Sequence, residues 1–183
     1  MLNSYDLKSP AKSAKDFATA AQLTQDMREG VNAAPRRPQV SVKRITGFGP
    51  MARITTSFGE VHAHVLREGD MIRTSNGQFE KITKINRIRL DEEFLARYPS
   101  VLPIKIRQGS LGPGFPTCDV QLAPYQKLRM GPPRTTSPLI FAAKLLERPF
   151  VERATESQIT YTTFSVGRAA SVYCEGMLVD IEA

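Results

Sequence analysis

The stretch Ile104–Lys127, IKIRQGSLGPGFPTCDVQLAPYQK, carries the clearest structural pattern in this chain. Its first residues alternate apolar and charged side chains, as a half-buried strand does, and the alternation resumes from Asp119 to Leu122. Between these two segments, several glycines and prolines interrupt any regular strand pairing. The stretch therefore predicts a strand, a loop rich in Gly and Pro, and a second strand.

The rest of the chain also predicts an all-β domain, because its short apolar segments are separated by turn residues. Asn76-Gly77 predicts a hairpin with a type I′ turn, since both residue types accept positive φ angles. One short helix is expected over residues 91–98, and a strand followed by a helical turn over 139–146. The other strands are expected over residues 52–56, 60–66, 71–73, 78–90 (with a bulge), 158–166 and 171–181.

Two parts are expected, an N-terminal arm over residues 1–39 and a β domain over residues 40–183. The arm has an amphipathic helical pattern over residues 13–29, followed by a Pro/Arg linker. Such a small helix either packs on its own domain or becomes ordered against another protein. The candidate contact residues are Phe17, Leu23 and Met27 on the helix, with Arg36, Arg37, Lys43 and Arg44 in the basic segment after it.

The 183 residues carry a formal charge of +7 and have a pI near 9.6. This charge is compatible with an anionic partner, although a charge of this size also serves solubility. Cys118 and Cys174 are the two cysteines, and two buried thiols are expected rather than a disulfide. The N-terminus has no apolar signal region, and no apolar run reaches the roughly 20 residues that span a bilayer. A cytoplasmic protein is expected.

The order and spacing of residues in the central stretch resemble those in the central segment of bacterial Hint (Hedgehog/intein) domains. The resemblance rests on Arg107-x-Gly109-x-Leu111-Gly112-x-Gly114-x-Pro116-x-x-Asp119-Val120-x-Leu122-x-Pro124. Further pieces follow the same order as in that family: Ile54-x-Thr56, Gly59, Leu66-x-x-Gly69-Asp70 and Thr74 near the start, then Tyr161 and Glu175-Gly176 near the end. The resemblance implies a flat, horseshoe-like β domain whose two ends lie together.

Active Hint domains perform an N–S acyl shift at the peptide bond before their first residue. This chemistry needs a thiol or hydroxyl nucleophile and an interior histidine that protonates the leaving nitrogen. By the resemblance, the nucleophile position falls on Gly47 and the histidine position on Gln126. Positions near the closing strands that often hold histidine fall on Thr163 and Ala169. Thr46 is one residue from the nucleophile position, and this slip should turn its side chain to the other face.

These substitutions favour a Hint-like domain that does not process itself and acts as a protein-binding or structural module. The alternative is a self-processing domain that uses Thr46 or an unrecognised nucleophile. A second alternative is a basic β-domain that binds nucleic acid, if the basic residues of segments 81–90 and 102–108 line one sheet face. No cofactor is expected. His62 and His64 share one face of an expected strand with Glu60, but without a fourth ligand no metal site is predicted.

Overall fold

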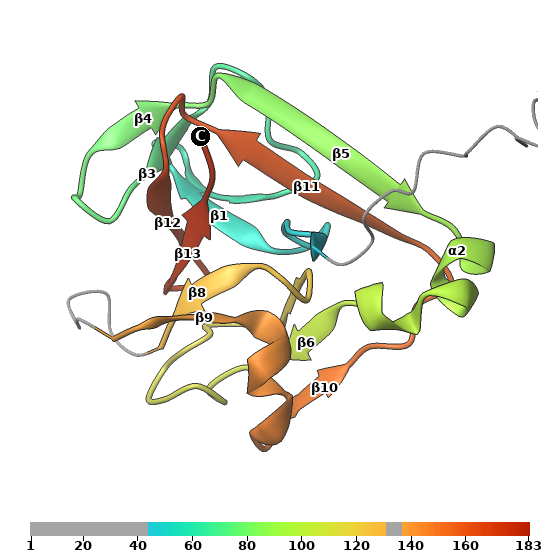
Figure 1. Cartoon of the computed structure of the whole chain (residues 1–183). Helices are drawn as coiled ribbons and strands as arrows, with labels where there is room; N and C mark the ends of the chain where they lie inside the picture. Colours follow the sequence, from blue (N-terminus) through green and yellow to red (C-terminus); the bar gives the residue numbers. More distant parts are fainter. Residues whose placement is uncertain (1–43, 131–136) are drawn as a thin grey trace, which may run out of the picture. The chain divides into compact units, whose positions relative to one another are not determined.

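The computed structural model describes residues 44–130 and 137–183, and this part of the chain is built mainly of short strands (Figure 1). The expectation of an all-β fold is confirmed. The strands are β1 Arg53–Thr56, β2 Gly59–His62, β3 Met71–Arg73, β4 Phe79–Lys81, β5 Lys84–Leu90, β6 Ile104–Ile106, β7 Val120–Leu122, β8 Lys127–Arg129, β9 Leu139–Phe141, β10 Val151–Arg153, β11 Ile159–Ser165, β12 Ala170–Cys174 and β13 Met177–Ile181. The helical elements are α2 Glu92–Arg97, η2 Pro99–Val101 and η3 Ala142–Glu147.

The largest sheet has the order β4-β3-β1-β12-β13-β8-β9, with β2 also paired to β1. The first strand of the domain therefore lies beside the last hairpin, and Ile54 is paired with Cys174 (Figure 1). A second sheet has the order β10-β6-β7, and β5 forms a long antiparallel ribbon with β11. Because β1 pairs with the closing hairpin, the start of the domain is brought next to its end.

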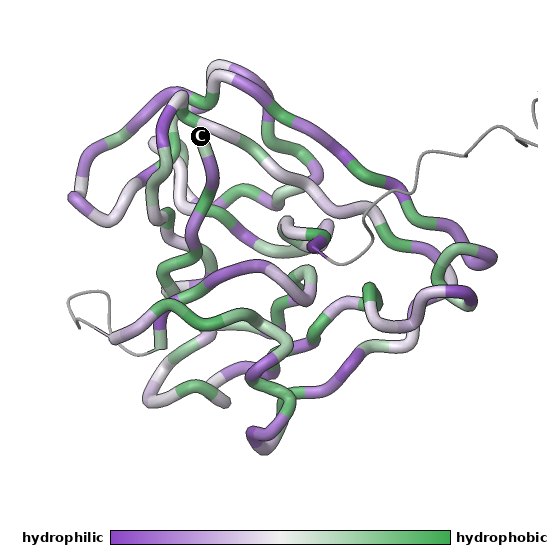
Figure 2. Tube along the Cα trace, in the orientation of Figure 1, coloured by the Kyte–Doolittle hydropathy of each residue, from purple (hydrophilic) through white to green (hydrophobic). Residues whose placement is uncertain are grey.

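The central stretch forms the predicted strand, loop and strand. β6 and β7 are antiparallel, with Ile104 opposite Leu122 and Ile106 opposite Val120. These four side chains are buried, because residues two apart on a strand point to the same face. The tube of Figure 2 shows hydrophobic and hydrophilic residues following one another along the long strand β5 as well. The pattern in the sequence thus reports directly which face of the strands is in the core.

Two hydrophobic clusters form the interior. The larger one joins the three sheets and includes Phe48, whose ring stacks on that of Phe164 at 5.3 Å. The smaller one surrounds Tyr161, whose hydroxyl donates a hydrogen bond to the carbonyl of Val101. Cys174 is buried, as expected, but Cys118 is exposed, so the expectation of two buried thiols is wrong for Cys118. Cys118 belongs to the loop between β6 and β7, where no strand covers it.

Three local predictions need correction. The hairpin at Asn76-Gly77 is present, but only Gly77 has a positive φ, so the turn is not type I′. The segment 78–90 is two strands rather than one bulged strand, because the chain leaves β3 at Ile82 and then pairs with β11. This change of partner explains a hydrophobic spacing that fits no single period. The strand predicted to reach Leu66 ends at His62.

Candidate functional site

The segment just before β1 lies between β7 and β11, where backbone hydrogen bonds hold it on both sides. Phe48 exchanges two hydrogen bonds with Thr162, of 2.8 and 2.9 Å. On the other side, the Gly49 amide donates to the Gln121 carbonyl at 2.8 Å, and the Ala123 amide donates to the Gly47 carbonyl at 2.9 Å. Since both edges of this segment are paired, its position in the domain is closely defined.

Gly47 has a backbone conformation that side chains of L-residues rarely adopt, with a φ of +132°. A Cβ atom at this position would lie 3.0 Å from the Thr162 carbonyl oxygen and 3.1 Å from Cγ2 of Thr163. Both the backbone angle and the space around it therefore favour glycine. A residue with a reactive side chain would have to displace β11 or change the backbone at this point.

Gln126 bridges Gly47 to the last strand and is only 4% exposed. Its Oε1 accepts a hydrogen bond of 2.8 Å from the Gly47 amide. Its Nε2 donates to the Asp180 carbonyl at 2.5 Å and to the Lys127 carbonyl at 3.3 Å. An amide side chain fits this place because it offers one acceptor and one donor group. Gln126 thereby connects the beginning of the domain with β13.

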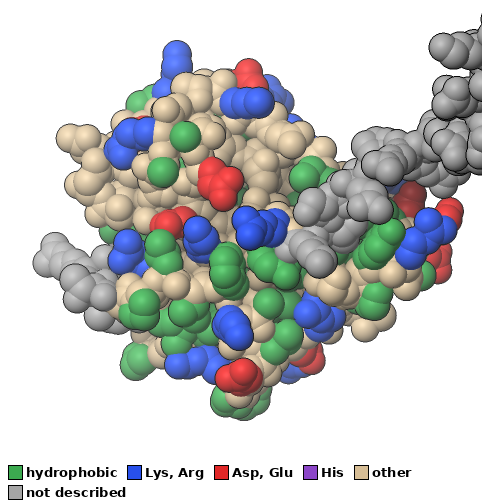
Figure 3. All heavy atoms as spheres, in the orientation of Figure 1, with side chains coloured by type: hydrophobic (Ala, Val, Ile, Leu, Met, Phe, Trp, Pro, Cys, Tyr) green, Lys and Arg blue, Asp and Glu red, His purple; other side chains and the backbone are tan. Residues whose placement is uncertain are grey.

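A cleft of about 790 Å³ opens beside this bridge. Its lining mixes basic, acidic, aromatic and hydroxyl-bearing side chains. It consists of Arg44, Thr46, Phe48, Lys84, Asn86, Tyr125, Gln126, Lys127, Phe141, Thr163, Phe164, Ser165, Ala169, Asp180, Ile181, Glu182 and Ala183. Within this lining there is no histidine and no cysteine. Figure 3 shows Lys and Arg side chains next to hydrophobic ones on the face that carries β8 and β9.

The fold brings together the positions that the resemblance singled out. Gln126, Thr163 and Ala169 line the cleft, and Gly47 is held against Gln126 and Thr163 at its edge. Thr46 also lines the cleft, although the one-residue slip was expected to turn its side chain away. The positive φ of Gly47 lies outside the extended geometry on which that expectation rested.

Among the predicted contact residues, Arg44 lies in the described part of the chain, where it is exposed and lines the cleft. Phe17, Leu23, Met27, Arg36, Arg37 and Lys43 lie outside the described residues, as does the arm over residues 1–39, so those predictions stay predictions. The basic segments 81–90 and 102–108 are not on neighbouring strands, because β5 pairs with β11, whereas β6 lies between β10 and β7. Periodicity identified each strand but contains no information about which strands become neighbours.

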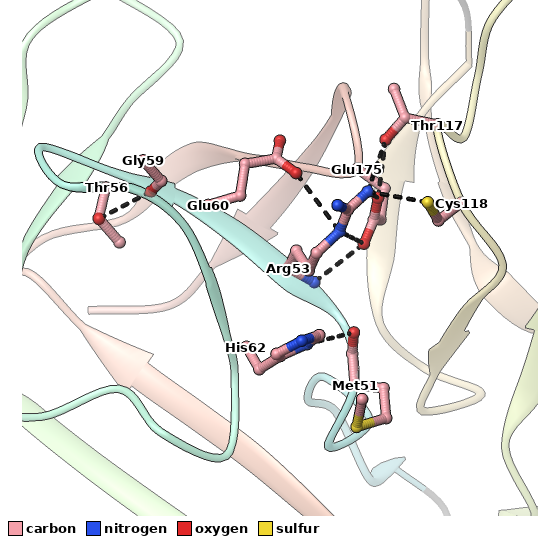
Figure 4. Close-up of polar contacts among 9 residues, drawn as sticks. All are labelled: Met51, Arg53, Thr56, Gly59, Glu60, His62, Thr117, Cys118 and Glu175. Atoms are coloured by element: carbon pink, nitrogen blue, oxygen red, sulfur yellow. Dashed lines mark hydrogen bonds and ion pairs between the residues drawn. The ribbon is translucent and has the colours of Figure 1, made fainter.

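A second polar cluster, which the sequence analysis missed, joins β1 to the turn between β12 and β13 (Figure 4). The Arg53 guanidinium binds the Glu175 carboxylate through two hydrogen bonds, of 2.8 Å from Nε and 2.6 Å from Nη2. Thr117 donates to the same carboxylate at 2.7 Å, and Arg53 Nη2 donates to Cys118 Sγ at 2.9 Å. The sequence contains no signal for this cluster, because its members come from three distant segments.

The charge of Glu175 is stabilised although its side chain is 1% exposed. Burial favours the neutral acid, but the hydrogen bonds from Arg53 and Thr117 outweigh it and hold the pKa of Glu175 below its ordinary value. The same pairing raises the pKa of Arg53. Burial raises the pKa of the Cys174 thiol, which favours its protonated, unreactive form. This side of the domain therefore holds a structural ion pair.

In the described part of the chain, no helix is long and apolar enough to span a bilayer.

Comparison with known proteins agrees with the fold. The sequence profile described as "Hint domain" matches residues 46–181. A variant of the gp41-1 intein with three substitutions has a similar fold, with a TM-score of 0.50 and 10% identity over 74% of this chain and 98% of that one. The parent gp41-1 intein is also similar, with a TM-score of 0.49 and 10% identity over 74% of this chain and 98% of that one. A bacterial intein-like domain from Clostridium thermocellum has a TM-score of 0.47 and 9% identity over 75% of this chain and 98% of that one. No curated protein sequence matches the chain. Because the profile covers most of its length, the chain belongs to the Hint domain family.

Proposed function

We propose that this chain is a Hint domain that does not cleave peptide bonds and instead acts as a protein-binding module. The observation that carries the proposal is the hydrogen bond from the Gly47 amide to Gln126 Oε1. It places a neutral amide against the peptide nitrogen that, in an active Hint domain, receives a proton when the bond breaks. On this proposal, the domain has the fold of the family but does not carry out the family's peptide-bond cleavage.

The first step of autoprocessing would need a nucleophile at position 47, and glycine supplies none. A side chain there would also meet the backbone of β11, since a Cβ atom would lie 3.0 Å from the Thr162 carbonyl. Attack on the preceding carbonyl requires close and defined placement of the nucleophile. Position 47 therefore has no nucleophile, and the local backbone geometry also disfavours a side chain that could supply one.

The second requirement is a proton for the leaving nitrogen, and Gln126 does not meet it. An amide exchanges no proton near neutral pH. Moreover, the atom it turns toward the Gly47 nitrogen is an acceptor oxygen, which stabilises the planar N–H of the intact peptide bond. The same bridge that joins the two ends of the domain thus favours the uncleaved state.

Thr46 is the nucleophile of the competing hypothesis, because it is one residue from the nucleophile position and is among the residues that line the cleft. Its hydroxyl would have to attack the carbonyl of Ile45, and the leaving nitrogen would then be that of Thr46. Gln126 contacts the nitrogen of Gly47 instead, one peptide bond further along the chain. The arrangement of polar groups therefore does not match cleavage before Thr46.

The cleft is the surface that fits a protein segment best. Arg44, Lys84 and Lys127 line it together with the acidic Asp180 and Glu182, and the exposed ring of Phe141 lies edge-on to Tyr125 at 5.6 Å. Charged groups of both signs around an aromatic pair suit a peptide that carries apolar and charged side chains. For nucleic acid, the strands offer less unpaired charge, because Arg107 forms an ion pair with Glu152.

Processing is tested on the full chain with a reporter protein fused before Met1. The fusion is incubated with dithiothreitol or hydroxylamine, and the masses of the products are measured by mass spectrometry. The intact fusion is the expected product. A fragment that begins at Gly47 or at Thr46 would overturn the proposal. The Thr46→Ala variant then tests Thr46 as the nucleophile, because it abolishes cleavage only if the Thr46 hydroxyl attacks.

Binding is tested by co-purification at native expression level with the wild type and with Phe141→Ala. Phe150→Ala is the matched control, since Phe150 is also exposed but does not line the cleft. We expect one protein to be lost with Phe141→Ala and kept with Phe150→Ala. Recovery of nucleic acid whose binding falls steeply with salt would instead support the nucleic-acid alternative.

A further inference from the structure

His62 and His64 form a close imidazole pair on the outside of the domain. His62 is the last residue of β2, and His64 lies in the turn that follows it. Their ring centroids are 5.7 Å apart and the ring planes differ by 28°. The sequence alone favours ordinary surface side chains here, so any case for a ligand site depends on what holds the two rings.

Each ring is oriented by a backbone carbonyl of the same turn. Nδ1 of His62 is 3.0 Å from the Met51 carbonyl oxygen (Figure 4), and Nδ1 of His64 is 2.7 Å from that of Pro50. A carbonyl oxygen only accepts hydrogen bonds, so Nδ1 must carry the proton in both rings. In the neutral imidazole, the lone pair is then on Nε2, which leaves this nitrogen as the one that can bind a metal ion.

This is the arrangement that metal-binding histidines use. A ligating imidazole donates its other ring N–H to a carbonyl or carboxylate, which fixes the tautomer and the direction of the ligating nitrogen. The turn that supplies the carbonyls is itself fixed, because Ala52 donates to Gly49 and Gly49 donates to Gln121. The structure therefore contains the hydrogen bonds that would support a two-imidazole site.

The charges nearby limit the site to two protein ligands. Glu60 is engaged with Arg53 at 3.4 Å. Within residues 44–130 and 137–183, no group of three or more His, Cys, Asp and Glu side chains is placed to hold a metal ion. Water would complete the coordination shell. With only two protein ligands, the site suits an ion that binds imidazole strongly. Among divalent first-row ions, Cu²⁺ has the highest affinity for such ligands.

We propose that the Nε2 atoms of His62 and His64 together bind one divalent transition-metal ion, with Cu²⁺ bound most tightly. Bonds of about 2.0–2.1 Å to each nitrogen require the two rings to tilt toward each other. The exposed side chain of His64 allows this movement without disturbing the core. The site does not depend on the proposed function, because it lies on the first hairpin and shares no residue with the cleft.

The test is calorimetric titration of the untagged full chain with Cu²⁺ in a buffer that does not bind the metal. We expect one ion per chain at this site, and an electron paramagnetic resonance spectrum with coupling to two imidazole nitrogens. His62→Ala and His64→Ala should each weaken binding by at least about tenfold, since even the loss of a supporting residue has an effect of this size.

The control is Glu60→Gln, which changes a neighbouring side chain and leaves both imidazoles in place. Its affinity for Cu²⁺ should equal that of the wild type, and circular dichroism should show that all three variants are folded. Equal binding by the wild type and both histidine variants would overturn the proposal. A loss with only one of the two variants would also overturn it, because it would indicate binding by a single histidine.

Discussion

Two polar clusters connect the beginning of this domain to its closing hairpin, and they do so by different chemistry. At Gly47, the connection is the neutral amide of Gln126, which also reaches the Asp180 carbonyl. At Arg53, it is a bidentate ion pair with the buried carboxylate of Glu175. The first lies at the cleft of the Hint fold, and the second lies where β1 meets the turn of the last hairpin.

The difference separates what the fold needs from what the family's reaction would need. Joining the two ends of the domain requires only matched donors and acceptors, and either cluster provides them. Breaking a peptide bond requires a nucleophile and a group that transfers a proton. The stabilised charge belongs to Glu175, which binds Arg53 and Thr117 and does not line the cleft, and so it supports structure rather than catalysis.

The largest effect is expected from Arg53→Ala, which leaves the Glu175 carboxylate buried without its partner. We expect a loss of about 3 kcal/mol in the free energy of unfolding, at the lower end for a buried pair because Arg53 is 30% exposed. Urea unfolding followed by circular dichroism measures it. Arg107→Ala is the control, since its partner Glu152 is 52% exposed and surface pairs contribute at most about 1 kcal/mol.

The same pair predicts a pH dependence. Because the pKa of Glu175 is lowered in the folded protein, its stabilising contribution is complete above the unfolded carboxyl pKa of about 4.3. It is lost as the pH falls through the lowered folded pKa. In Arg53→Ala, burial without the partner should raise the folded pKa of Glu175, so the difference between the two proteins should shrink as the pH falls from that raised pKa toward the lowered pKa of the wild type. A difference that stays constant down to pH 2 would contradict this assignment.

The next effect is expected from Gly47→Ala, because a residue with a side chain is strained at a φ of +132°. Strain of this kind costs about 1–3 kcal/mol, and the contacts with β11 add to it. Gly112→Ala is the matched control, with a φ of +146° and no atom within 4 Å of its Cβ position. Equal losses in urea unfolding for the two variants would indicate that crowding at Gly47 is unimportant.

A smaller effect is expected from Gln126→Ala, which removes the partners of the Gly47 amide and the Asp180 carbonyl. Unpaired buried groups of this kind cost about 1–3 kcal/mol. Gln126→His should restore much of this at neutral pH, because a neutral imidazole also offers one donor and one acceptor.

Acid should remove that rescue. Protonated histidine has no acceptor for the Gly47 amide, so the folded protein would disfavour protonation and lower the pKa of the introduced side chain. The stability gained over Gln126→Ala is then complete above the unfolded histidine pKa of about 6.5, and it is lost as the pH falls below that value. A gain that persists at pH 5 would show that the bridge depends on shape rather than on the acceptor.

Much of the fold follows from local patterns in the chain. The alternation around Ile104 and Leu122 predicted β6 and β7, and Asp91 at the start of a polar, leucine-containing segment predicted α2, which it caps by accepting from the Phe94 amide. At Asn76-Gly77 the same kind of reasoning predicted the hairpin but not its turn type. There, the side chain of Asn76 accepts a hydrogen bond from the Gln78 amide, and Asn76 does not have the positive φ that a type I′ turn requires.

The resemblance to the family was enough to select Gly47, Gln126, Thr163 and Ala169 as one group of positions. It did not predict the hydrogen bond between the first two, nor the conformation that excludes a side chain at Gly47. The ion pair of Arg53 with Glu175 and the orientation of His62 and His64 were also not predictable. Each of these depends on atoms from segments that only the fold brings within hydrogen-bond distance.

By itself, the sequence determined an all-β domain of the Hint family, because strand periodicity, turn residues and motif order are properties of neighbouring positions in the chain. The tertiary structure decided which polar atoms meet at the cleft and at the closing hairpin. Hydrogen bonds and ion pairs act over a few ångströms, so their partners are set by how the strands pair rather than by distance along the sequence.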